Sequence, residues 1–211
     1  MMKAEFWHQK WQTGQIGFHE STPNKLLTDH FQNLKLNENS SIFVPLCGKT
    51  NDIAWLLNQG YQVVGAELSK IAIDELFDNL KLQPNITQIG NLLHYQSNNL
   101  EVYVGNIFDI PKNALTSIDA IYDRAALVAL PESIRKQYSQ HLMLLCPTAK
   151  HLLIVFTYDQ SQMQGPPFSI PESEILSLYQ SNYQITMLHQ QMLTTGRLAE
   201  IKAVESIWLL S

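Results

Sequence analysis

The sequence predicts an α/β protein with a mostly parallel β-sheet, helices on both faces of the sheet and one antiparallel edge strand. Three observations lead to this fold class. From residue 41 onward, short β-rich runs alternate with segments of helical spacing, which is typical of parallel α/β sheets. Hydrophobic residues make up 45% of the 211 residues, enough to fill a sizeable core. Glycine and proline are spread along the chain, which favours a single domain over residues 1–211.

A β-α-β unit opens this core. It consists of a strand over Ser41–Pro45, a helix from about Asn51 and a strand over Gln62–Glu67, followed by a helix over Ile71–Leu80. Apolar side chains in both helical segments recur at helical spacing. Thr50 or Asn51 is expected to cap the first helix and Ser69 the second, because hydroxyl and amide side chains satisfy the free N–H groups of a first turn.

The later elements continue the alternation. Strands are expected over Glu101–Val104, Ile118–Tyr122, His151–Tyr158, Tyr183–His189 and Ala203–Leu210, with helices over Pro131–Leu145 and Pro171–Ser181. Each of these helices opens on a proline, which suits a first helical turn. No helical pattern separates the last two strands, so they are expected to pair as an antiparallel hairpin.

The first 40 residues form an N-terminal arm ahead of the predicted core over residues 41–211. The arm is too rich in aromatic residues for a disordered tail and too short for a domain. We expect it to lie across the sheet. Its large aromatic side chains are Trp7, Trp11, Phe18 and Phe31.

Charge and composition exclude several classes of partner. The net charge is −5 and no run of basic residues occurs, so nucleic acid is not expected to bind. No apolar stretch approaches the roughly 20 residues that cross a bilayer, so no membrane insertion is expected. Cys47 and Cys146 lie in apolar surroundings without a signal peptide, which favours a cytoplasmic protein with free thiols. The histidines and cysteines show no spacing of metal ligands, so no metal site is predicted.

Ligands of open α/β sheets bind beyond the carboxyl ends of the strands. The turn over residues 44–50 contains Gly-Lys-Thr, but Phe43 stands where a phosphate loop needs glycine, and only one glycine of the dinucleotide fingerprint can be matched. Glu67, in contrast, ends the second strand 19 residues after Gly48, where nucleoside-binding units place a carboxylate for the two ribose hydroxyls. A ribose site without a phosphate site points to S-adenosylmethionine as the cofactor, the alternative being that Glu67 is an ordinary surface carboxylate.

Five motifs, in order along the chain, resemble the thiopurine S-methyltransferase family. The resemblance implies a class I methyltransferase with a Rossmann-like, seven-stranded sheet and S-adenosyl-L-methionine as methyl donor. The arm would then close over the cofactor. The motifs are Trp11 with residues 14–19 (Gly-Gln-Ile-Gly-Phe-His), residues 44–48, residues 63–69, residues 122–127 (Tyr-Asp-Arg-Ala-Ala-Leu) and residues 165–168 (Gly-Pro-Pro-Phe).

Carried over residue by residue, the resemblance implies that Trp11, Leu46, Glu67 and Arg124 contact the cofactor, with Gly48 in the same turn as Leu46. An aromatic face such as that of Trp11 can stabilise the compact cation of a sulfonium. Alternatively, Trp7 and Trp11 only anchor the arm, and for Trp7 we prefer this interpretation. Leu46 could equally be part of the core.

Two further positions carry the cofactor hypothesis. Asn106 replaces an acidic residue found in many bacterial relatives, and its amide oxygen can still accept a hydrogen bond from the adenine amino group, with backbone groups around Asn106 and Ile107 contributing. Arg124 follows the fourth predicted strand and is the candidate catalytic residue, because its guanidinium could orient the cofactor carboxylate or an anionic acceptor. An ion pair with Asp123 is the structural alternative.

The acceptor pocket is expected beside the loop Asp159–Ser169, whose Pro166 and Phe168 suit an aromatic substrate. His19 and Asp159 are possible proton acceptors, although a lone histidine in a loop is more often structural. Arg197 is a weaker candidate for acceptor binding. The implied function is S-methylation of aromatic or heterocyclic thiols, in detoxification, by a monomer. The alternatives are small inorganic acceptors such as selenium or tellurium species or halides, and a regulatory module that binds the cofactor without catalysis.

Overall fold

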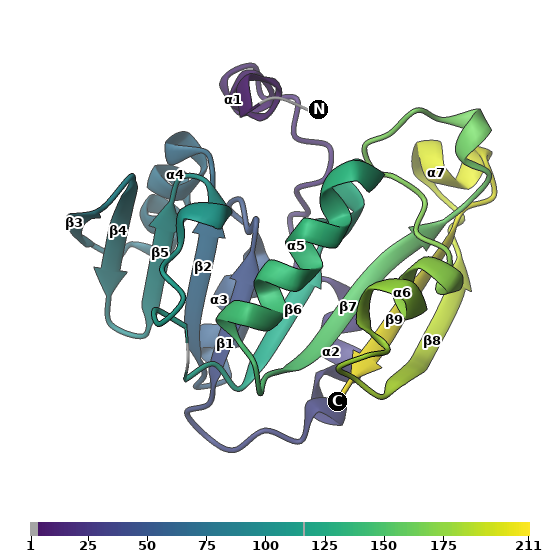
Figure 1. Cartoon of the computed structure of the whole chain (residues 1–211). Coiled ribbons are helices and arrows are strands. Elements are labelled where there is room, and N and C mark those ends of the chain that lie inside the picture. Colours follow the sequence, from purple (N-terminus) through teal and green to yellow (C-terminus); the bar gives the residue numbers. More distant parts are fainter. Residues whose placement is uncertain (1–3, 116) are drawn as a thin grey trace.

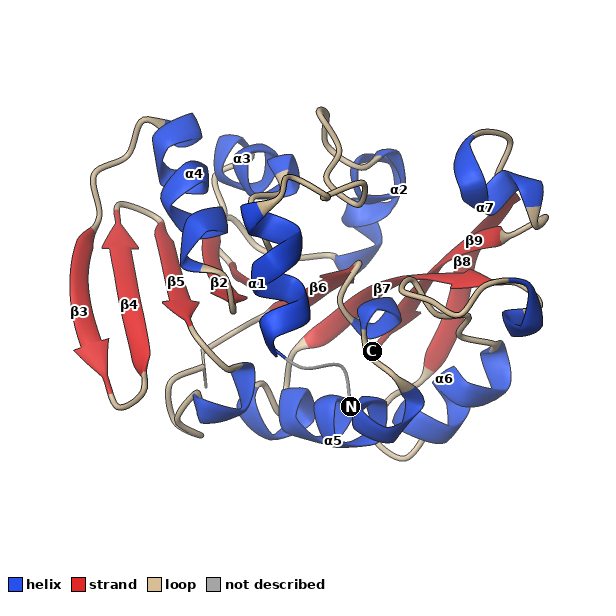
Figure 2. Ribbon diagram, turned by 90° about the horizontal axis from the view of Figure 1, so that it is seen from above, coloured by secondary structure: helices blue, strands red, loops and turns tan. Residues whose placement is uncertain are grey.

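The computed structural model describes residues 4–115 and 117–211. One nine-stranded sheet crosses the molecule in the order β3-β4-β5-β2-β1-β6-β7-β9-β8, with β3 at one edge and β8 at the other (Figure 1). Helices cover both faces: α2, α3 and α4 lie on one side and α5 and α6 on the other (Figure 2). The predicted fold class, a mostly parallel sheet between two layers of helices, is confirmed.

The first β-α-β unit has the predicted form. It comprises β1 (Ser41–Pro45), α3 (Asn51–Asn58), β2 (Gln62–Glu67) and α4 (Lys70–Leu80). Strand β1 lies at the centre of the sheet and pairs in parallel with both β2 and β6. Thr50, and not Asn51, caps α3 through its hydroxyl. Ser69 caps α4, as predicted.

The remaining core elements differ from the prediction by a few residues at their ends. The fourth predicted strand begins and ends two residues later than expected, so Arg124 is its last residue and does not follow it. The elements are β5 (Leu100–Val104), β6 (Ala120–Arg124), α5 (Glu132–Leu145), β7 (Lys150–Thr157) and α6 (Glu172–Tyr179).

The sheet has two strands more than the implied seven. Strands β3 (Asn85–Ile89) and β4 (Leu92–Ser97) form a hairpin that extends the sheet beyond β5. Every residue of β3 is exposed or half-buried, so no run of buried apolar residues marks this strand in the sequence. The pair Gly90-Asn91 joins the two strands, and such a two-residue turn is the signal that could have predicted the hairpin.

The C-terminal hairpin was predicted correctly, but its connection was not. Strand β9 (Val204–Leu210) pairs antiparallel with β8 (Ile185–Met192) and also with β7, so the reversed strand lies one position in from the edge. A short helix, α7 (Gly196–Glu200), connects β8 to β9 where no helix was expected. Five residues are too few for helical periodicity to be visible in a sequence.

Two apolar layers hold the sheet. One lies under α5 and α6 and the other under α2, α3 and α4. The first includes Phe43, Tyr138, Leu142, Ile175 and Tyr179, and the second Leu27, Phe31, Ile53, Ile73 and Phe77.

The N-terminal arm divides into two parts. Helix α1 (Ala4–Gln12) lies over the carboxyl ends of the central strands (Figure 2), whereas α2 (Lys25–His30) packs into the core. Asn24 caps α2 through its side chain, and its backbone N–H donates to Asp52 at 2.7 Å. Tyr122 donates to the second oxygen of Asp52 at 3.0 Å. These bonds tie the arm to α3 and β6.

The structure also bears on membrane spans, disulfides and metal sites. In the described part of the chain no helix is long and apolar enough to cross a membrane. Cys47 and Cys146 are buried free thiols. Residues 4–115 and 117–211 contain no cluster of three or more His, Cys, Asp or Glu side chains that could hold a metal ion.

Candidate functional site

The turns that follow β1 and β6 bring the predicted residues together. Because β2, β1 and β6 are neighbours in the sheet and run in parallel, their carboxyl ends meet at one edge. Leu46 follows β1 with φ +48°, and Ala125 follows β6 with φ +59°. Side chains other than glycine rarely occupy this left-handed region, and such backbone strain concentrates at ligand-binding turns. Two strained turns therefore lie at the edge of the sheet that was predicted to bind the cofactor.

Glu67 ends β2 and is held rigidly. Its Oε2 accepts the backbone N–H of Gly48 at 2.8 Å, and its Oε1 accepts that of Ser69 at 2.8 Å. The side chain is buried, and this burial raises the pKa of the carboxyl, while the backbone hydrogen bonds partly counteract the rise. A carboxylate has about four acceptor positions. Two acceptor positions on Glu67 are thus left for other donors.

Trp11 lies against the turn that follows β1. A β-carbon at Gly48 would come within 2.8 Å of the indole ring, so the two residues are in direct contact. Lys49 places its ammonium 6.0 Å from the centroid of the indole. Phe18 packs edge-to-face on Trp11 at 5.6 Å and on Trp7 at 5.8 Å. Trp7 therefore packs within the arm, whereas Trp11 joins the arm to the sheet.

Arg124 projects toward the arm. Its Nη1 donates to the backbone carbonyl of Phe18 at 2.9 Å, and its Nη2 forms an ion pair with Glu20. The Arg124 side chain is 12% exposed and that of Glu20 44% exposed. The proposed ion pair with Asp123 is wrong, because adjacent residues of a strand point to opposite faces of the sheet.

Asp123 is buried on the far side of β6 from the arm. It accepts hydrogen bonds from the backbone of Leu127 at 3.0 Å and from the Tyr138 hydroxyl at 2.7 Å. Burial raises the pKa of Asp123 to about 6. The hydrogen bond to Leu127 closes the turn that follows Arg124, so Asp123 helps to position that turn.

Asn106 and Ile107 follow β5 beside this edge. The Asn106 side-chain oxygen accepts the backbone N–H of Phe108 at 3.2 Å, and the Ile107 carbonyl accepts from His141 at 2.9 Å. An sp² oxygen accepts two hydrogen bonds. The predicted contact of Asn106 with an adenine amino group therefore needs the second lone pair of an oxygen that already caps a turn.

His19 belongs to the arm and is half-buried. Burial lowers its pKa, and the neighbouring cations Lys49 and Arg124 lower it further. The lowered pKa keeps the imidazole largely neutral near pH 7 and makes it a weaker base than a free histidine. Its role in the reaction stays a prediction.

The loop Asp159–Ser169 is held by several hydrogen bonds. The backbone N–H of Phe168 donates to Val128 at 2.7 Å, and the Tyr158 hydroxyl donates to the carbonyl of Pro167 at 2.5 Å. Pro166 and Phe168 are half-buried, and the guanidinium of Arg135 lies 5.9 Å from the Phe168 ring. The loop is thus an ordered wall beside the carboxyl end of β7. Asp159 caps the short helical turn Gln160–Gln162.

One buried charge near this edge was not predicted. Glu205 on β9 is 8% exposed and accepts a hydrogen bond from Gln191 of β8 at 3.2 Å. Burial raises its pKa, the hydrogen bond from Gln191 and the charge of Arg124 counteract that rise, and the charge of Glu20 adds to it. The signal that could have predicted it is a single acidic residue within the otherwise mostly apolar run Ala-Val-Glu-Ser-Ile-Trp-Leu-Leu. Carboxylates are rarely buried unless they are paired with another group.

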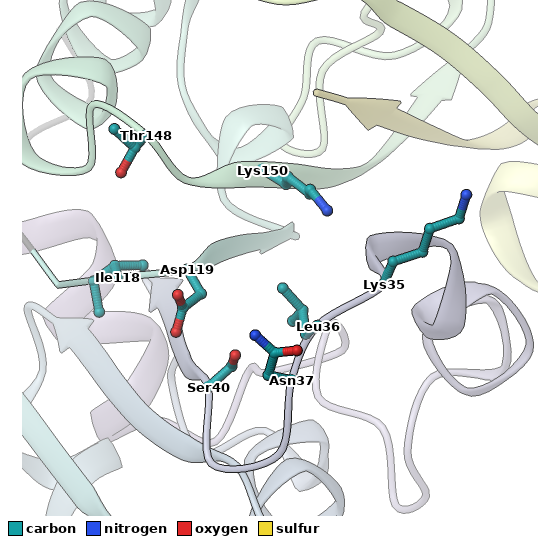
Figure 3. A pocket seen from close by; sticks show the side chains of 8 residues that line it. All are labelled: Lys35, Leu36, Asn37, Ser40, Ile118, Asp119, Thr148 and Lys150. Atoms are coloured by element: carbon teal, nitrogen blue, oxygen red, sulfur yellow. The ribbon is translucent and has the colours of Figure 1, made fainter.

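Two surface cavities lie away from this edge. One, of about 230 Å³, opens near the starts of β1, β6 and β7 (Figure 3). Its polar groups are largely engaged, since Asp119 accepts the backbone N–H of Ser41 at 2.8 Å and Lys150 donates to the Leu34 carbonyl at 2.6 Å. The other, of about 330 Å³, lies between α5 and α6. Neither cavity includes a residue predicted to bind cofactor or acceptor.

Comparison with known proteins identifies the family. The family model described as thiopurine S-methyltransferase matches residues 2–207, nearly the whole chain. The chain belongs to the thiopurine S-methyltransferase family. It is therefore an S-adenosylmethionine-dependent methyltransferase, as the motifs predicted.

Two curated relatives match over nearly their full length. A thiopurine S-methyltransferase of Teredinibacter turnerae is 49% identical over 210 residues, which is 100% of this chain and 98% of the relative. One of Acinetobacter baylyi is 44% identical over 214 residues, covering 100% of this chain and 99% of the relative. Such coverage leaves no large segment of either relative without a counterpart.

Solved structures share the fold at low sequence identity. The 1,6-didemethyltoxoflavin-N1-methyltransferase of Burkholderia thailandensis, with bound S-adenosylhomocysteine, superimposes with a TM-score of 0.68 at 14% identity, covering 98% of this chain and 85% of that chain. A TehB-like methyltransferase of Corynebacterium glutamicum has a TM-score of 0.57 at 13% identity, covering 99% and 98%. These likenesses confirm the Rossmann-like methyltransferase fold.

The carboxyl edge fits the cofactor of the family. The buried Glu67 carboxylate keeps acceptor positions for a vicinal diol, and the turn after β1 lacks the glycine pattern of a phosphate loop. The Trp11 ring, packed on Gly48, supplies an aromatic face beside the same turn. Both features suit a nucleoside that carries a cation and lacks phosphates.

Proposed function

We propose that this methyltransferase transfers the methyl group of S-adenosylmethionine to the sulfur of aromatic or heterocyclic thiols, in detoxification. The observation that carries the proposal is an apolar cluster beside the carboxyl end of β7, built on Tyr158, Met163 and Ala203. Side chains of Leu193, Leu198 and Ile201 pack against it. An acceptor bound beside this cluster would meet apolar side chains, which favours a flat, poorly hydrated molecule over a small hydrated anion. Relatives named thiopurine S-methyltransferase support the same acceptor class.

The cofactor side of the proposal rests on residues of the carboxyl edge. When bound, S-adenosylmethionine supplies an electrophilic methyl group on a sulfonium. Glu67 would accept hydrogen bonds from the ribose hydroxyls, because the backbone N–H groups of Gly48 and Ser69 already hold both of its carboxylate oxygens in place. Trp11 would shield the cation from water, and Leu46 and Gly48 would line the same turn. Adenine would lie against Asn106 and Ile107.

On the acceptor side, Arg124 is the candidate catalytic residue. Its guanidinium is held by the Phe18 carbonyl and by Glu20, which orients it along the edge between the arm and β6. A cation in this place would stabilise an acceptor thiolate, or alternatively the cofactor carboxylate. Pro166 and Phe168 would wall the far side of the acceptor, and neutral His19 could take up a proton.

Catalysis then depends chiefly on positioning. A thiolate is a strong nucleophile, and aryl thiols ionise readily, so the enzyme needs to hold sulfur and methyl carbon in line and to exclude water. The ordered loop Asp159–Ser169 and the arm can provide this exclusion from two sides. Arm and core would act together in one monomer, as a single domain in the cytoplasm.

The direct test measures transfer of labelled methyl from S-adenosylmethionine to a panel of acceptors. The panel contains a thiophenol, a thiopurine, selenite, tellurite and iodide, with Glu67→Ala as the control enzyme. Methylation of the two thiols that is lost in the control supports the proposal. Turnover of the inorganic acceptors alone would replace the substrate class, and cofactor binding without any turnover would favour a regulatory module.

A further inference from the structure

Glu205 lies on the same face of the sheet as Arg124. Arg124 is paired with Ile154 of β7, and Ile154 is paired with Ile207 of β9. Paired residues share a face, as do residues two apart in a strand, so Glu205 points to the side from which Arg124 meets the arm. Glu205 is one pair from the end of the β7–β9 ladder, which closes with Thr157 and Val204. Two strand spacings, roughly 10 Å, separate the two backbones across the sheet, and Glu205 lies two residues, roughly 7 Å, further along the strand direction.

The carboxylate of Glu205 is buried but only partly used. Among the described residues its one hydrogen bond comes from Gln191, at 3.2 Å. A carboxylate has about four acceptor positions, and a buried one is costly unless they are filled. The charged groups that face it are Arg124 of β6 and Glu20 of the arm. Glu205 is thus poised to accept a proton or a hydrogen bond from a ligand beside Arg124.

The surroundings of Glu205 favour a flat, heterocyclic ligand that can donate a hydrogen bond. The apolar cluster of Tyr158, Met163 and Ala203 begins next to the start of β9, so it adjoins Glu205 along the chain. A heterocyclic thiol with nitrogen beside the sulfur-bearing carbon exists largely as a thione with a ring N–H. The ring N–H of such a thione is a donor that a carboxylate can accept. The N–H must be lost when the sulfur is alkylated.

We propose that Glu205 accepts the ring N–H proton of a heterocyclic thione acceptor, an inference that rests on the proposed function. A bond forms between the acceptor sulfur and the methyl carbon, while the bond from that carbon to the cofactor sulfur breaks and leaves its electron pair on the cofactor. The ring N–H bond supplies the electron pair that restores aromaticity, and its proton passes to the Glu205 carboxylate. Glu205 is then a catalytic residue for thiones and is not required for simple aryl thiols.

The test compares two acceptors of similar size, 2-mercaptopyridine and thiophenol, of which only the first has a ring nitrogen. Glu205→Gln keeps the shape and the neighbour Gln191 but cannot take up a proton. We expect kcat/KM for 2-mercaptopyridine to fall about tenfold to a hundredfold, the range for losing a hydrogen bond to a charged group, and kcat/KM for thiophenol to stay within about twofold. In calorimetry with S-adenosylhomocysteine present, Glu205→Gln should bind 2-mercaptopyridine more weakly than the wild type does, and should bind thiophenol equally well.

Controls separate a local role from a structural one. Glu101→Gln removes another strand carboxylate, which is held by His94 of the neighbouring strand at 2.9 Å, and should leave both acceptors unaffected. Glu205→Asp, which retains the charge, is the second variant and should retain more activity on 2-mercaptopyridine than Glu205→Gln does. Thermal unfolding and cofactor affinity of each variant verify its fold.

The outcomes distinguish this inference from the proposed function. Equal losses on both acceptors, or no loss on either, would overturn the role of Glu205 while leaving S-methylation intact. A wild-type enzyme that methylates thiophenol but not 2-mercaptopyridine would do the same. If the wild-type enzyme binds S-adenosylmethionine and methylates neither thiol, the proposed function itself fails, and this inference fails with it.

Discussion

Trp11 rests on Gly48, and a β-carbon at Gly48 would lie 2.8 Å from the indole Cζ2 and 3.2 Å from Cη2. Gly48 also has φ +52°, a conformation that other residues rarely adopt, and its N–H donates to Glu67. One small residue thus lets the arm approach the sheet at the point where the ribose carboxylate is anchored. The absence of a side chain at Gly48 is required by this contact.

The first prediction concerns this contact. Gly48→Ala should displace Trp11 and loosen α1, because the methyl group and the ring cannot occupy the same space. Hydrogen exchange in residues 4–12 should become faster and cofactor affinity weaker. Gly60→Ala is the matched control, since Gly60 has φ +86° but nothing within 4 Å of its would-be β-carbon. Exchange that becomes equally faster in both variants would show that backbone strain, and not the Trp11 contact, is responsible, and unchanged exchange in both would contradict the prediction.

The second prediction tests the ribose carboxylate. Glu67→Ala should weaken cofactor affinity by about 1 to 3 kcal/mol, the cost of leaving buried hydrogen-bonding groups unpaired. Isothermal calorimetry with S-adenosylhomocysteine measures the change. Asp78→Ala, an exposed position on α4, removes the same charge without touching the site. An affinity that Glu67→Ala leaves unchanged would mean that the ribose binds elsewhere.

The third prediction concerns the link between Arg124 and the arm. Glu20→Ala removes an ion pair at a partly exposed position, and such pairs contribute up to about 1 kcal/mol. The arm should therefore open up to about fivefold more often, which hydrogen exchange in α1 would report. Glu5→Ala makes the same charge change at an exposed position within α1. If exchange in α1 is unchanged by Glu20→Ala, the ion pair does not hold the arm.

The fourth prediction follows from a buried histidine. His151 is fully buried, and neither ring nitrogen has a hydrogen-bond partner among the described residues. Burial lowers its pKa to about 3, against about 6.5 in the unfolded chain. Between these values only the unfolded chain binds the proton, so His151 makes the protein less stable as pH falls below about 6.5. Asp123 lies 3.8 Å away, and its pKa, raised to about 6, leaves it largely neutral at pH 5.

His151→Leu should remove this acid sensitivity. The effect of His151→Leu on the free energy of unfolding should be about 2 kcal/mol more favourable at pH 5 than at pH 7. Each pH unit below 6.5 costs the wild type about 1.4 kcal/mol, and pH 5 lies about 1.5 units below. Urea unfolding at the two pH values measures it. His189→Leu controls for loss of an imidazole at an exposed position on β8. An identical pH dependence in the wild type and His151→Leu would contradict the prediction.

Sequence reasoning was most successful where a signal is local. The bounds of β1 and β2 were predicted to the residue, because each is a short apolar run bounded by turn residues, and the Ser69 cap precedes its helix directly. The β3–β4 hairpin was missed because β3 is an exposed edge strand without a buried face. Helix α7 was missed because it is shorter than two helical turns.

The sequence by itself determined the α/β class, the central β-α-β unit and the methyltransferase family. Strand ends and caps are encoded within a few residues of each other, and each family motif is a short local run. Only the tertiary structure decided what those residues touch. Arg124 meets the Phe18 carbonyl across 106 positions of the chain, and Glu205 shares its face only through the register of β6, β7 and β9. Such contacts depend on how the arm and the C-terminal hairpin pack against the sheet, and packing between distant segments leaves no periodic trace in a sequence.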